Sequence, residues 1–336
     1  MTRIAINGFG RIGRAFFKLA FERPELEVVA INDLTEPETL AYLLRYDTVY
    51  GHYNKEVKAS EGSLVVEGKK VQVLSEKDPS LLPWGKLGID VVVESTGRFT
   101  KYEDAEKHLK AGAKRVVITA PAEGKIPHVL IGANDEEFVS GLAPITSDAS
   151  CTTNAVVPVA AVMMENPGVV KGMLNTTHAY TATQSLVDGP ASKDPRRGRA
   201  AAQNIVPSST GAAESVIKSL KGLEGVFEGI ALRVPVASGS IVDFTFLAKR
   251  ETSVEEINGI FKKAAKDPRW EKVLAVTEEP LVSSDIVGDP HGAIVDLSMT
   301  RVVAKDLVKV LAWYDNEWGY SNTLVEHVVR VGNLIK

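Results

Sequence analysis

The feature that most constrains the fold is a short apolar strand, Arg3–Asn7, that runs directly into the glycine-rich sequence Gly8-Phe9-Gly10-Arg11-Ile12-Gly13. Apolar residues then recur at helical spacing through Arg14–Glu22, and a second strand, Glu27–Asn32, ends at Asp33. Because the connection is long enough to hold a helix, we expect the two strands to pair in parallel. The chain is therefore predicted to begin with a strand–helix–strand unit.

This unit has the features of a dinucleotide site. Gly8 and Gly10 let the backbone turn sharply and approach a pyrophosphate, which then lies at the N-terminus of the following helix. Asp33 suits the ribose hydroxyls and would repel a 2′-phosphate. The pattern predicts NAD rather than NADP, and the alternative is a glycine turn that binds no nucleotide.

The remainder of the first half continues the same alternation. Ile89–Glu94 and Arg115–Thr119 are apolar runs typical of strands covered on both faces, with a helix expected over Tyr102–Ala111. Residues 1 to about 150 are therefore predicted to form an α/β domain with a doubly wound parallel Rossmann sheet.

The second half has a different succession of predicted helices, strands and loops. A helix is expected through Asn154–Met164, then a strand ending near His178, a long polar loop over Ala182–Arg199 and an alternating strand over Val242–Ala248. Residues 151–316 are predicted to form an α+β domain for catalysis and oligomerisation, with a mixed, largely antiparallel sheet. The last helix, about 317–336, is expected to pack back onto the first domain through its apolar stripe.

Composition excludes several classes of protein. A chain of 336 residues suggests two domains, and a net charge of −4 gives no reason to expect nucleic acid or a membrane as the main partner. A single cysteine cannot form an internal disulfide, and no charged-then-apolar leader or membrane-spanning run is visible. We expect a cytoplasmic protein, and no metal site is predicted.

The single cysteine is the candidate nucleophile. Ser150-Cys151-Thr152-Thr153-Asn154 precedes an apolar helical run, so Cys151 is expected at a helix N-terminus, where the helix dipole lowers a thiol pKa from its reference of about 8.5. A lone cysteine is often a small core residue instead. The flanking hydroxyls argue against that role.

A proton acceptor is expected among the six histidines. His178 stands in Thr176-Thr177-His178-Ala179-Tyr180-Thr181, where hydroxyls suit an anion. His108 and His327 fall in helical, surface-compatible patterns, which favours solvated or satisfied structural roles. The other candidates are His52, His128 and His291.

Five motifs in order resemble those of the glyceraldehyde-3-phosphate dehydrogenases, over the whole chain: Asn7–Arg14, Ser150–Asn154, His178–Thr181, Ser209-Thr210-Gly211-Ala212-Ala213 and Trp313-Tyr314-Asp315-Asn316-Glu317. The resemblance implies that Cys151 attacks the aldehyde, that His178 is the base, and that the product leaves by attack of inorganic phosphate on a thioester. It also implies NAD as cofactor, D-glyceraldehyde 3-phosphate as substrate, and a homotetramer.

The resemblance assigns further site residues. The substrate phosphate would be bound by Thr181, Thr183 and Arg233, the inorganic phosphate by Ser150, Thr152, Thr210 and Gly211, and Arg197 lies between the two. The cofactor would be bound by Asn7, Gly8, Phe9, Gly10, Arg11, Ile12, Asp33, Lys77, Thr96, Gly97, Thr119 and Asn316. Without the resemblance, Arg196, Arg197 and Arg199 are an ordinary solvated charge run.

Three positions depart from the family pattern. Asp148 replaces a usual Asn. Its carboxylate would either oppose thiolate formation at Cys151, or face away and cap the following helix or accept backbone amides. Ala155 replaces a frequent second cysteine, and Lys77 replaces a common Arg near the adenine. Two rival functions remain open: a dehydrogenase of erythrose 4-phosphate and a nucleotide-binding protein without catalysis.

Overall fold

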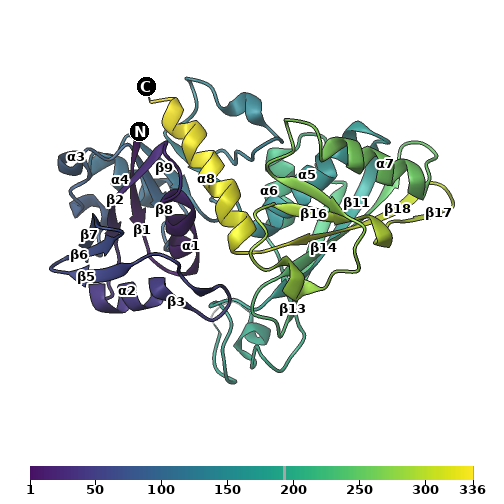
Figure 1. The fold of residues 1–336 in the computed structure, drawn as a ribbon. Helices are drawn as coiled ribbons and strands as arrows, with labels where there is room; N and C mark the ends of the chain where they lie inside the picture. Colours follow the sequence, from purple (N-terminus) through teal and green to yellow (C-terminus); the bar gives the residue numbers. More distant parts are fainter. Residues whose placement is uncertain (192–193, 336) are drawn as a thin grey trace. The chain divides into compact units, whose positions relative to one another are not determined.

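The computed structural model describes residues 1–191 and 194–335, and Figure 1 shows the chain coloured along its sequence. The chain divides into two compact units. Unit 1 comprises Met1–Val129, Asp135–Ala149 and the chain from Leu324 onward, and unit 2 comprises Leu130–Asn134 and Ser150–Thr323. The structure thus divides the C-terminal helix at Leu324, whereas the sequence assigned that helix from about residue 317 to the first domain.

The sheet of unit 1 has the strand order β10-β9-β8-β1-β2-β7-β6-β5. The strands with parallel neighbours are β1 (Thr2–Asn7), β2 (Leu26–Asn32), β7 (Lys69–Leu74), β8 (Val91–Glu94), β9 (Arg115–Ile118) and β10 (Ile145–Ser147). The strand order reverses between β1 and β8, where ligands bind in open α/β sheets. The register of these two strands places Asn7 opposite Glu94. The predicted doubly wound parallel sheet is confirmed.

The sequence did not predict the antiparallel edge of this sheet. β5 (Val57–Ser60) and β6 (Ser63–Val66) extend it beyond β7, and β3 (Tyr46–Asp47) pairs separately with β4 (Gly51–His52). Tight turns join β5, β6 and β7, and their glycines, Gly62 and Gly68, have φ of +59° and +76°. Strands this short carry too little apolar pattern to be recognised locally.

The helices of unit 1 are α1 (Arg11–Ala20), α2 (Pro37–Arg45), α3 (Trp84–Leu87), α4 (Tyr102–Lys110) and the last part of α8 (Trp318–Asn333). Leu324, Val325 and Val328 of α8 are buried in the same apolar core as Phe16 and Phe17 of α1. The expectation that the terminal apolar stripe packs in a core is confirmed.

Unit 2 contains a mixed sheet with the order β12-β13-β11-β14-β18-β16-β15, and β17 pairs with β18. Its strands are β11 (Val169–Ala179), β12 (Val206–Ser209), β13 (Phe227–Val234), β14 (Ser240–Ala248), β15 (Leu274–Thr277), β16 (Ala293–Asp296), β17 (Arg301–Val303) and β18 (Leu307–Tyr314). Within the described residues of this sheet, only β11 with β13 and β15 with β16 pair in parallel. The predicted largely antiparallel sheet is confirmed.

The helices of unit 2 are α5 (Cys151–Glu165), α6 (Ala212–Ser219) and α7 (Val254–Ala264). α5 contacts β14, β16 and β18, while α6 contacts β13 and α7 contacts β15. Side chains that alternate with the buried ones, including Met173, Ile230 and Leu307, are exposed and line a hollow of about 880 Å³. None of the helices in the described part of the chain is long and apolar enough to cross a membrane.

Candidate active site

Cys151 is the first residue of α5, as the sequence predicted. Ser150 caps the helix, because its hydroxyl accepts a hydrogen bond from the Thr153 N–H at 3.1 Å. The helix is buried from Thr152 to Met163, whereas Cys151 remains partly exposed. The apolar helix therefore presents one reactive side chain at its start.

His178 lies near the end of β11, with its Nε2 atom 3.3 Å from the Sγ atom of Cys151. Its Nδ1 atom lies 2.6 Å from the carbonyl oxygen of Ala179. With the hydrogen on Nδ1 donated to this carbonyl, the lone pair of Nε2 faces the sulfur. This is the tautomer that a proton acceptor needs.

Arg233 stands opposite His178 in the parallel register of β11 and β13. Its Nη1 atom donates to the Ala179 carbonyl at 3.1 Å and lies 2.8 Å from the Nδ1 atom of His178. A guanidinium has only donors, so the carbonyl is its acceptor when Nδ1 carries a hydrogen. One carbonyl thus orients both the imidazole and the guanidinium.

Burial dominates the protonation of the cysteine and histidine. Burial, with the Arg233 charge second, lowers the pKa of His178 to about 3. Burial raises the pKa of the Cys151 thiol, although the Arg233 charge and hydrogen bonds from Thr152 act in the opposite direction. The expectation of a lowered thiol pKa was wrong because the cost of a charge in these dense surroundings exceeds the local stabilisation. The resting pair is a thiol beside a neutral imidazole.

Tyr314 connects the elements that carry these two side chains, a role that the sequence analysis missed. Its hydroxyl lies 3.0 Å from the Thr152 Oγ1 atom in α5 and 2.9 Å from the Thr176 Oγ1 atom in β11. Its ring also packs edge-on against His178, with ring centroids 5.9 Å apart. The alternation of β18 pointed Tyr314 inward, but only the fold shows what it meets. We conclude that Tyr314 holds the start of α5 against β11.

The candidate ligands of the substrate phosphate lie close to this pair in sequence and fold. The hydroxyls of Thr181 and Thr183, just after β11, are 3.0 Å apart. Arg197 lies in a short 3-10 helix, Pro195–Gly198, and its Nη2 atom donates to the Ser208 hydroxyl at 3.3 Å. Its charge contributes to the lowered pKa of His178, so it lies near the imidazole.

The neighbouring arginines, Arg196 and Arg199, fit the ordinary solvated charge run that the sequence also allowed. Arg196 forms an exposed ion pair with Asp194, and Arg199 forms one with Asp188. Exposed pairs of this kind contribute little to stability. Of the three arginines, Arg197 is the one whose charge contributes to the pKa of His178, after burial and the Arg233 charge.

The candidate ligands of inorganic phosphate lie at two helix starts. The Thr210 hydroxyl accepts the Ala212 N–H at 3.1 Å, and Gly211 is the exposed residue before α6. The side chains of Ser150 and Thr152 are already engaged in the contacts described above, and Thr152 is only 4% exposed. An anion at the start of α5 would therefore meet backbone amides more readily than the Thr152 hydroxyl.

The glycine loop of unit 1 has the shape that a dinucleotide requires. Gly8 has φ of +92°, and a Cβ atom there would lie 2.8 Å from the backbone nitrogen of Thr96. A Cβ atom on Gly13 would lie 2.2 Å from the Gly8 carbonyl oxygen. Gly10 is exposed with open space where a Cβ would project, so a pyrophosphate can approach its backbone and the start of α1.

Next to this loop lies a pocket of about 500 Å³. Asp33 lines it, and two of its carboxylate acceptor positions are taken by the N–H groups of Phe9 at 2.7 Å and Thr35 at 3.0 Å. A carboxylate has about four such positions, so two remain for ribose hydroxyls. Other predicted cofactor residues that line the pocket are Asn7, Gly8, Gly10, Lys77 and Thr96. These residues fit the adenosine half of NAD.

Some predicted cofactor residues lie outside this pocket. The Phe9 side chain is buried and packs against Phe17, so only its backbone faces the loop. Arg11 forms an ion pair with Asp47 at 2.6 Å, and Ile12 packs partly buried against the core of unit 1. Gly97 has φ of +67° in the exposed turn after β8, and Thr119 follows β9, where its N–H donates to the Glu94 carbonyl.

Asn316 belongs to unit 2, where it follows β18. Its Oδ1 atom accepts the Ser240 hydroxyl at 2.8 Å, and that hydroxyl in turn accepts the Ala179 N–H at 3.1 Å. The side-chain amide is therefore oriented with its N–H₂ group away from these acceptors. Such an amide suits a carboxamide oxygen.

Asp148 is fully buried in unit 1 and does not cap α5, because Ser150 does. Its Oδ1 atom lies 3.2 Å from the Nδ1 atom of His327 in α8, and the Nε2 atom of His327 lies 2.9 Å from the Thr146 hydroxyl. Burial raises the pKa of Asp148, and the His327 contact lowers it. The helix-capping alternative for Asp148 is therefore wrong.

The other histidines have structural surroundings. His108 and His327 are both 0% exposed and hydrogen-bonded, which agrees with the satisfied structural role that the sequence favoured and rules out the solvated one. His52 is exposed in β4, His128 is buried, and His291 contacts Asp289 at 2.8 Å. Across residues 1–191 and 194–335, no group of three or more histidine, cysteine, aspartate or glutamate side chains is arranged to hold a metal ion.

Comparisons with known proteins agree with this geometry. Residues 2–102 match the family described as glyceraldehyde 3-phosphate dehydrogenase, NAD binding domain, and residues 150–316 match the corresponding C-terminal domain. Similar curated proteins include glyceraldehyde-3-phosphate dehydrogenase of Streptomyces coelicolor, 49% identical over 98% of both chains, and glyceraldehyde-3-phosphate dehydrogenase 1 of Bacillus cereus, 50% identical over 97% of both. The protein of that name from Geobacillus stearothermophilus is 47% identical over 97% of this chain and 96% of its own.

Proposed function

The chain belongs to the glyceraldehyde-3-phosphate dehydrogenase family, and we propose that it converts D-glyceraldehyde 3-phosphate to 1,3-bisphosphoglycerate through a thioester on Cys151. NAD and inorganic phosphate are the co-substrates, and the reaction belongs to glycolysis and gluconeogenesis. The observation that carries the proposal is the 3.3 Å contact between the Cys151 sulfur and the Nε2 atom of His178.

The first step is attack of the Cys151 sulfur on the aldehyde carbon. His178 accepts the thiol proton at Nε2 as the C–S bond forms, and that proton passes to the aldehyde oxygen, which becomes the hydroxyl of a hemithioacetal. When bound, NAD supplies the acceptor for the hydride that leaves the substrate carbon. His178 takes the hydroxyl proton as the carbonyl of the thioester forms. Phosphate then attacks this carbonyl, releasing the acyl phosphate and the Cys151 thiolate, which His178 reprotonates.

The phosphate ligands that we propose lie in unit 2. Thr181, Thr183 and Arg233 bind the phosphate of the substrate, and Thr210 and Gly211, together with the start of α5, bind the attacking phosphate. Arg197 serves both anions. The guanidinium of Arg233 lies beside the imidazole, so a phosphate bound to it is close to the reacting carbon.

The residues of unit 1 bind the adenosine and pyrophosphate portions of the cofactor, and Asn316 holds the nicotinamide carboxamide. Residues 1–150 act as the cofactor domain and residues 151–316 as the catalytic domain. Asp33 selects NAD because a 2′-phosphate would meet its carboxylate. Lys77 is exposed at the rim of the pocket, where an ammonium can replace the usual arginine.

A cytoplasmic homotetramer is the form that we propose in solution. The sheet face of unit 2 that carries exposed Met173, Ile230 and Leu307 supports it, because exposed apolar surface of this extent favours association. Analytical ultracentrifugation tests it: Met173→Asp should shift the tetramer toward smaller species, and a monomeric wild type contradicts the assembly.

The activity is tested by following NADH formation while aldehyde, NAD and phosphate are each omitted in turn. Sustained turnover should need all three. Erythrose 4-phosphate, offered in parallel, should give a lower kcat/KM; a higher value would assign the chain to the rival dehydrogenase. A chain that binds NAD but turns over neither sugar would be the binding protein without catalysis.

A further inference from the structure

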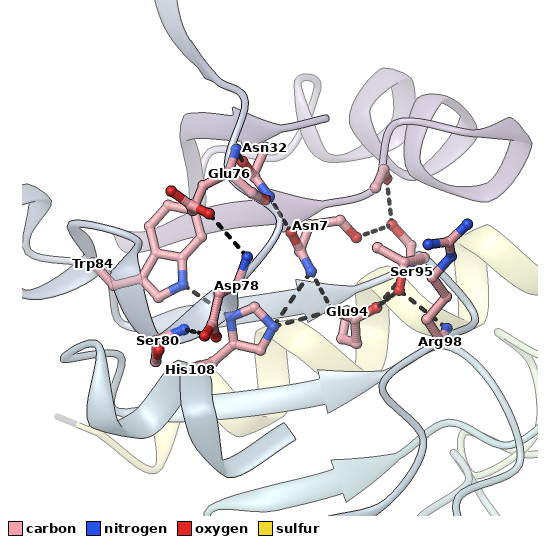
Figure 2. A network of polar contacts seen from close by, with 12 residues as sticks. Asn7, Asn32, Glu76, Asp78, Ser80, Trp84, Glu94, Ser95, Arg98 and His108 are labelled. Carbon is pink, nitrogen blue, oxygen red and sulfur yellow. Dashed lines mark hydrogen bonds and ion pairs between the residues drawn. The ribbon is translucent and has the colours of Figure 1, made fainter. Parts of the chain in front are cut away.

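A buried carboxylate lies beneath the nucleotide pocket, and none of the roles described above uses it. Glu94 ends β8, directly opposite Asn7 at the end of β1, and is 1% exposed. Figure 2 shows it at the centre of a polar network that reaches from Trp84 to Asn32. Within residues 1–191 and 194–335, no lysine or arginine is among its hydrogen-bond partners.

Both carboxylate oxygens of Glu94 receive hydrogen bonds from groups that belong to the pocket wall. Its Oε2 atom accepts the Asn7 Nδ2–H at 2.5 Å, and its Oε1 atom accepts the Thr96 N–H at 2.9 Å and the Thr96 hydroxyl. Asn7 and Thr96 line the nucleotide pocket. Glu94 therefore connects the two chain segments that converge at the reversal of strand order.

His108 and Trp84 determine how Glu94 is held. The indole Nε1–H of Trp84 can only donate, and it lies 3.0 Å from the Nδ1 atom of His108. The hydrogen of the imidazole must then be on Nε2, which lies 3.0 Å from the Oε2 atom of Glu94. The hydrogen-bond partners of the Glu94 side chain in the described part of the chain are thus all donors, an arrangement that suits the acceptor oxygens of a carboxylate.

The same network shapes the glycine loop. Asn7 accepts at Oδ1 from Asn32 Nδ2 at 2.7 Å, which ties β1 to the end of β2. Gly8 packs against the Thr96 backbone so tightly that a Cβ atom would lie 2.8 Å from its nitrogen. A displacement of Thr96 therefore moves the wall against which Gly8 turns.

We propose that Glu94 is a positioning residue for NAD, which sets the binding conformation of the Gly8 loop by holding Asn7 and Thr96 together. It touches no bound group itself and acts from beneath the pocket. The inference rests on the proposed assignment of this pocket to NAD.

The test is NAD binding by isothermal titration calorimetry, without substrate. In Glu94→Gln, the new N–H₂ group faces donors wherever it points, so affinity should fall by at least about tenfold, as expected for loss of charge-assisted hydrogen bonds. His108→Gln retains an N–H donor for Glu94 and should keep most of the affinity, whereas His108→Leu should lose it. In steady-state kinetics, Glu94→Gln should raise the KM for NAD and leave kcat within about twofold.

The matched control is Thr146→Val, which removes a buried hydrogen bond to His327 in the same unit, away from the pocket residues. It should lower the melting temperature without weakening NAD binding. Equal affinity in folded Glu94→Gln and wild type overturns the inference, as does an equal loss of affinity in Thr146→Val. A wild type that binds no NAD contradicts the assignment of the pocket itself.

Discussion

The imidazole of His178 faces the thiol of Cys151 at 3.3 Å, and one guanidinium, that of Arg233, acts on both groups. The Arg233 charge lowers the pKa of each, so it favours a thiolate and disfavours an imidazolium. This arrangement keeps the base neutral at physiological pH and reduces the cost of charge on sulfur during attack.

Replacing Arg233 by Gln should raise the pKa of Cys151 further, because a positive charge that favours the thiolate is removed. The pH dependence of iodoacetamide reaction measures this directly and needs no substrate binding. Arg196→Gln is the matched control, since Arg196 pairs with Asp194 at the surface. An unchanged or downward-shifted reaction profile in Arg233→Gln contradicts the assigned electrostatic role.

His178→Asn should lower kcat by about 10²–10⁴-fold, the usual contribution of a positioned general base. The same substitution at His291, which contacts Asp289 in the same unit, should leave kcat essentially unchanged. Because the pKa of His178 is about 3, the base should remain available as pH falls from neutral toward that value. A wild-type rate that falls as pH drops through about 6 would instead show that His178 titrates as an ordinary histidine.

Asp33 should account for cofactor choice. Asp33→Ser removes the carboxylate that a 2′-phosphate would meet, so the ratio of kcat/KM for NAD over NADP should fall by about tenfold or more. Steady-state kinetics with both cofactors measures this ratio. A wild type that uses NADP as well as NAD, or a variant with an unaltered ratio, contradicts the assignment.

Asp148 and His327 provide a pH-dependent test of stability. The pKa of Asp148 is raised by burial, so folding takes up a proton at pH values between the unfolded pKa of about 3.9 and the folded pKa, and the chain loses stability as pH rises through this interval. Asp148→Asn lacks this charge, so its melting temperature relative to wild type should increase over that interval and then level off.

The contrast is Asp188, which is exposed beside Arg199 and has a lowered pKa. Its small stabilising contribution is present above the unfolded pKa. The melting temperature of Asp188→Asn relative to wild type should therefore fall slightly as pH rises. A difference between Asp148→Asn and wild type that is independent of pH, or that follows the sign of the Asp188 series, counts against the buried-charge account.

The features that were predicted correctly depend on residues that are neighbours along the chain. The strand, glycine turn and helix around Gly8 and the placement of Cys151 at the start of α5 depend on neighbours along the chain. The contact of Asp148 with His327 does not, because these residues are 179 positions apart. His108 and His327 looked surface-compatible since a helical pattern carries no information about what covers its polar face.

The direction of the Cys151 pKa was missed for a related reason. The helix start is visible in the sequence, whereas burial and the contribution of the Arg233 charge depend on how β11 and β13 pair. Glu94 was treated only as the end of a strand, because two of its donors, Asn7 and His108, come from segments far from it along the chain. The charge states of buried groups depend on contacts between distant parts of the chain, which composition and periodicity do not reveal.

The central claim, a thioester on Cys151 that phosphate releases, is tested most directly by rapid mixing of enzyme with NAD and D-glyceraldehyde 3-phosphate in the absence of phosphate. The account predicts a burst of about one NADH per active site, followed by a slow phase. Mass spectrometry should locate an acyl group on Cys151 that disappears when phosphate is added. Sustained turnover without phosphate, or an unmodified Cys151 after the burst, contradicts the account.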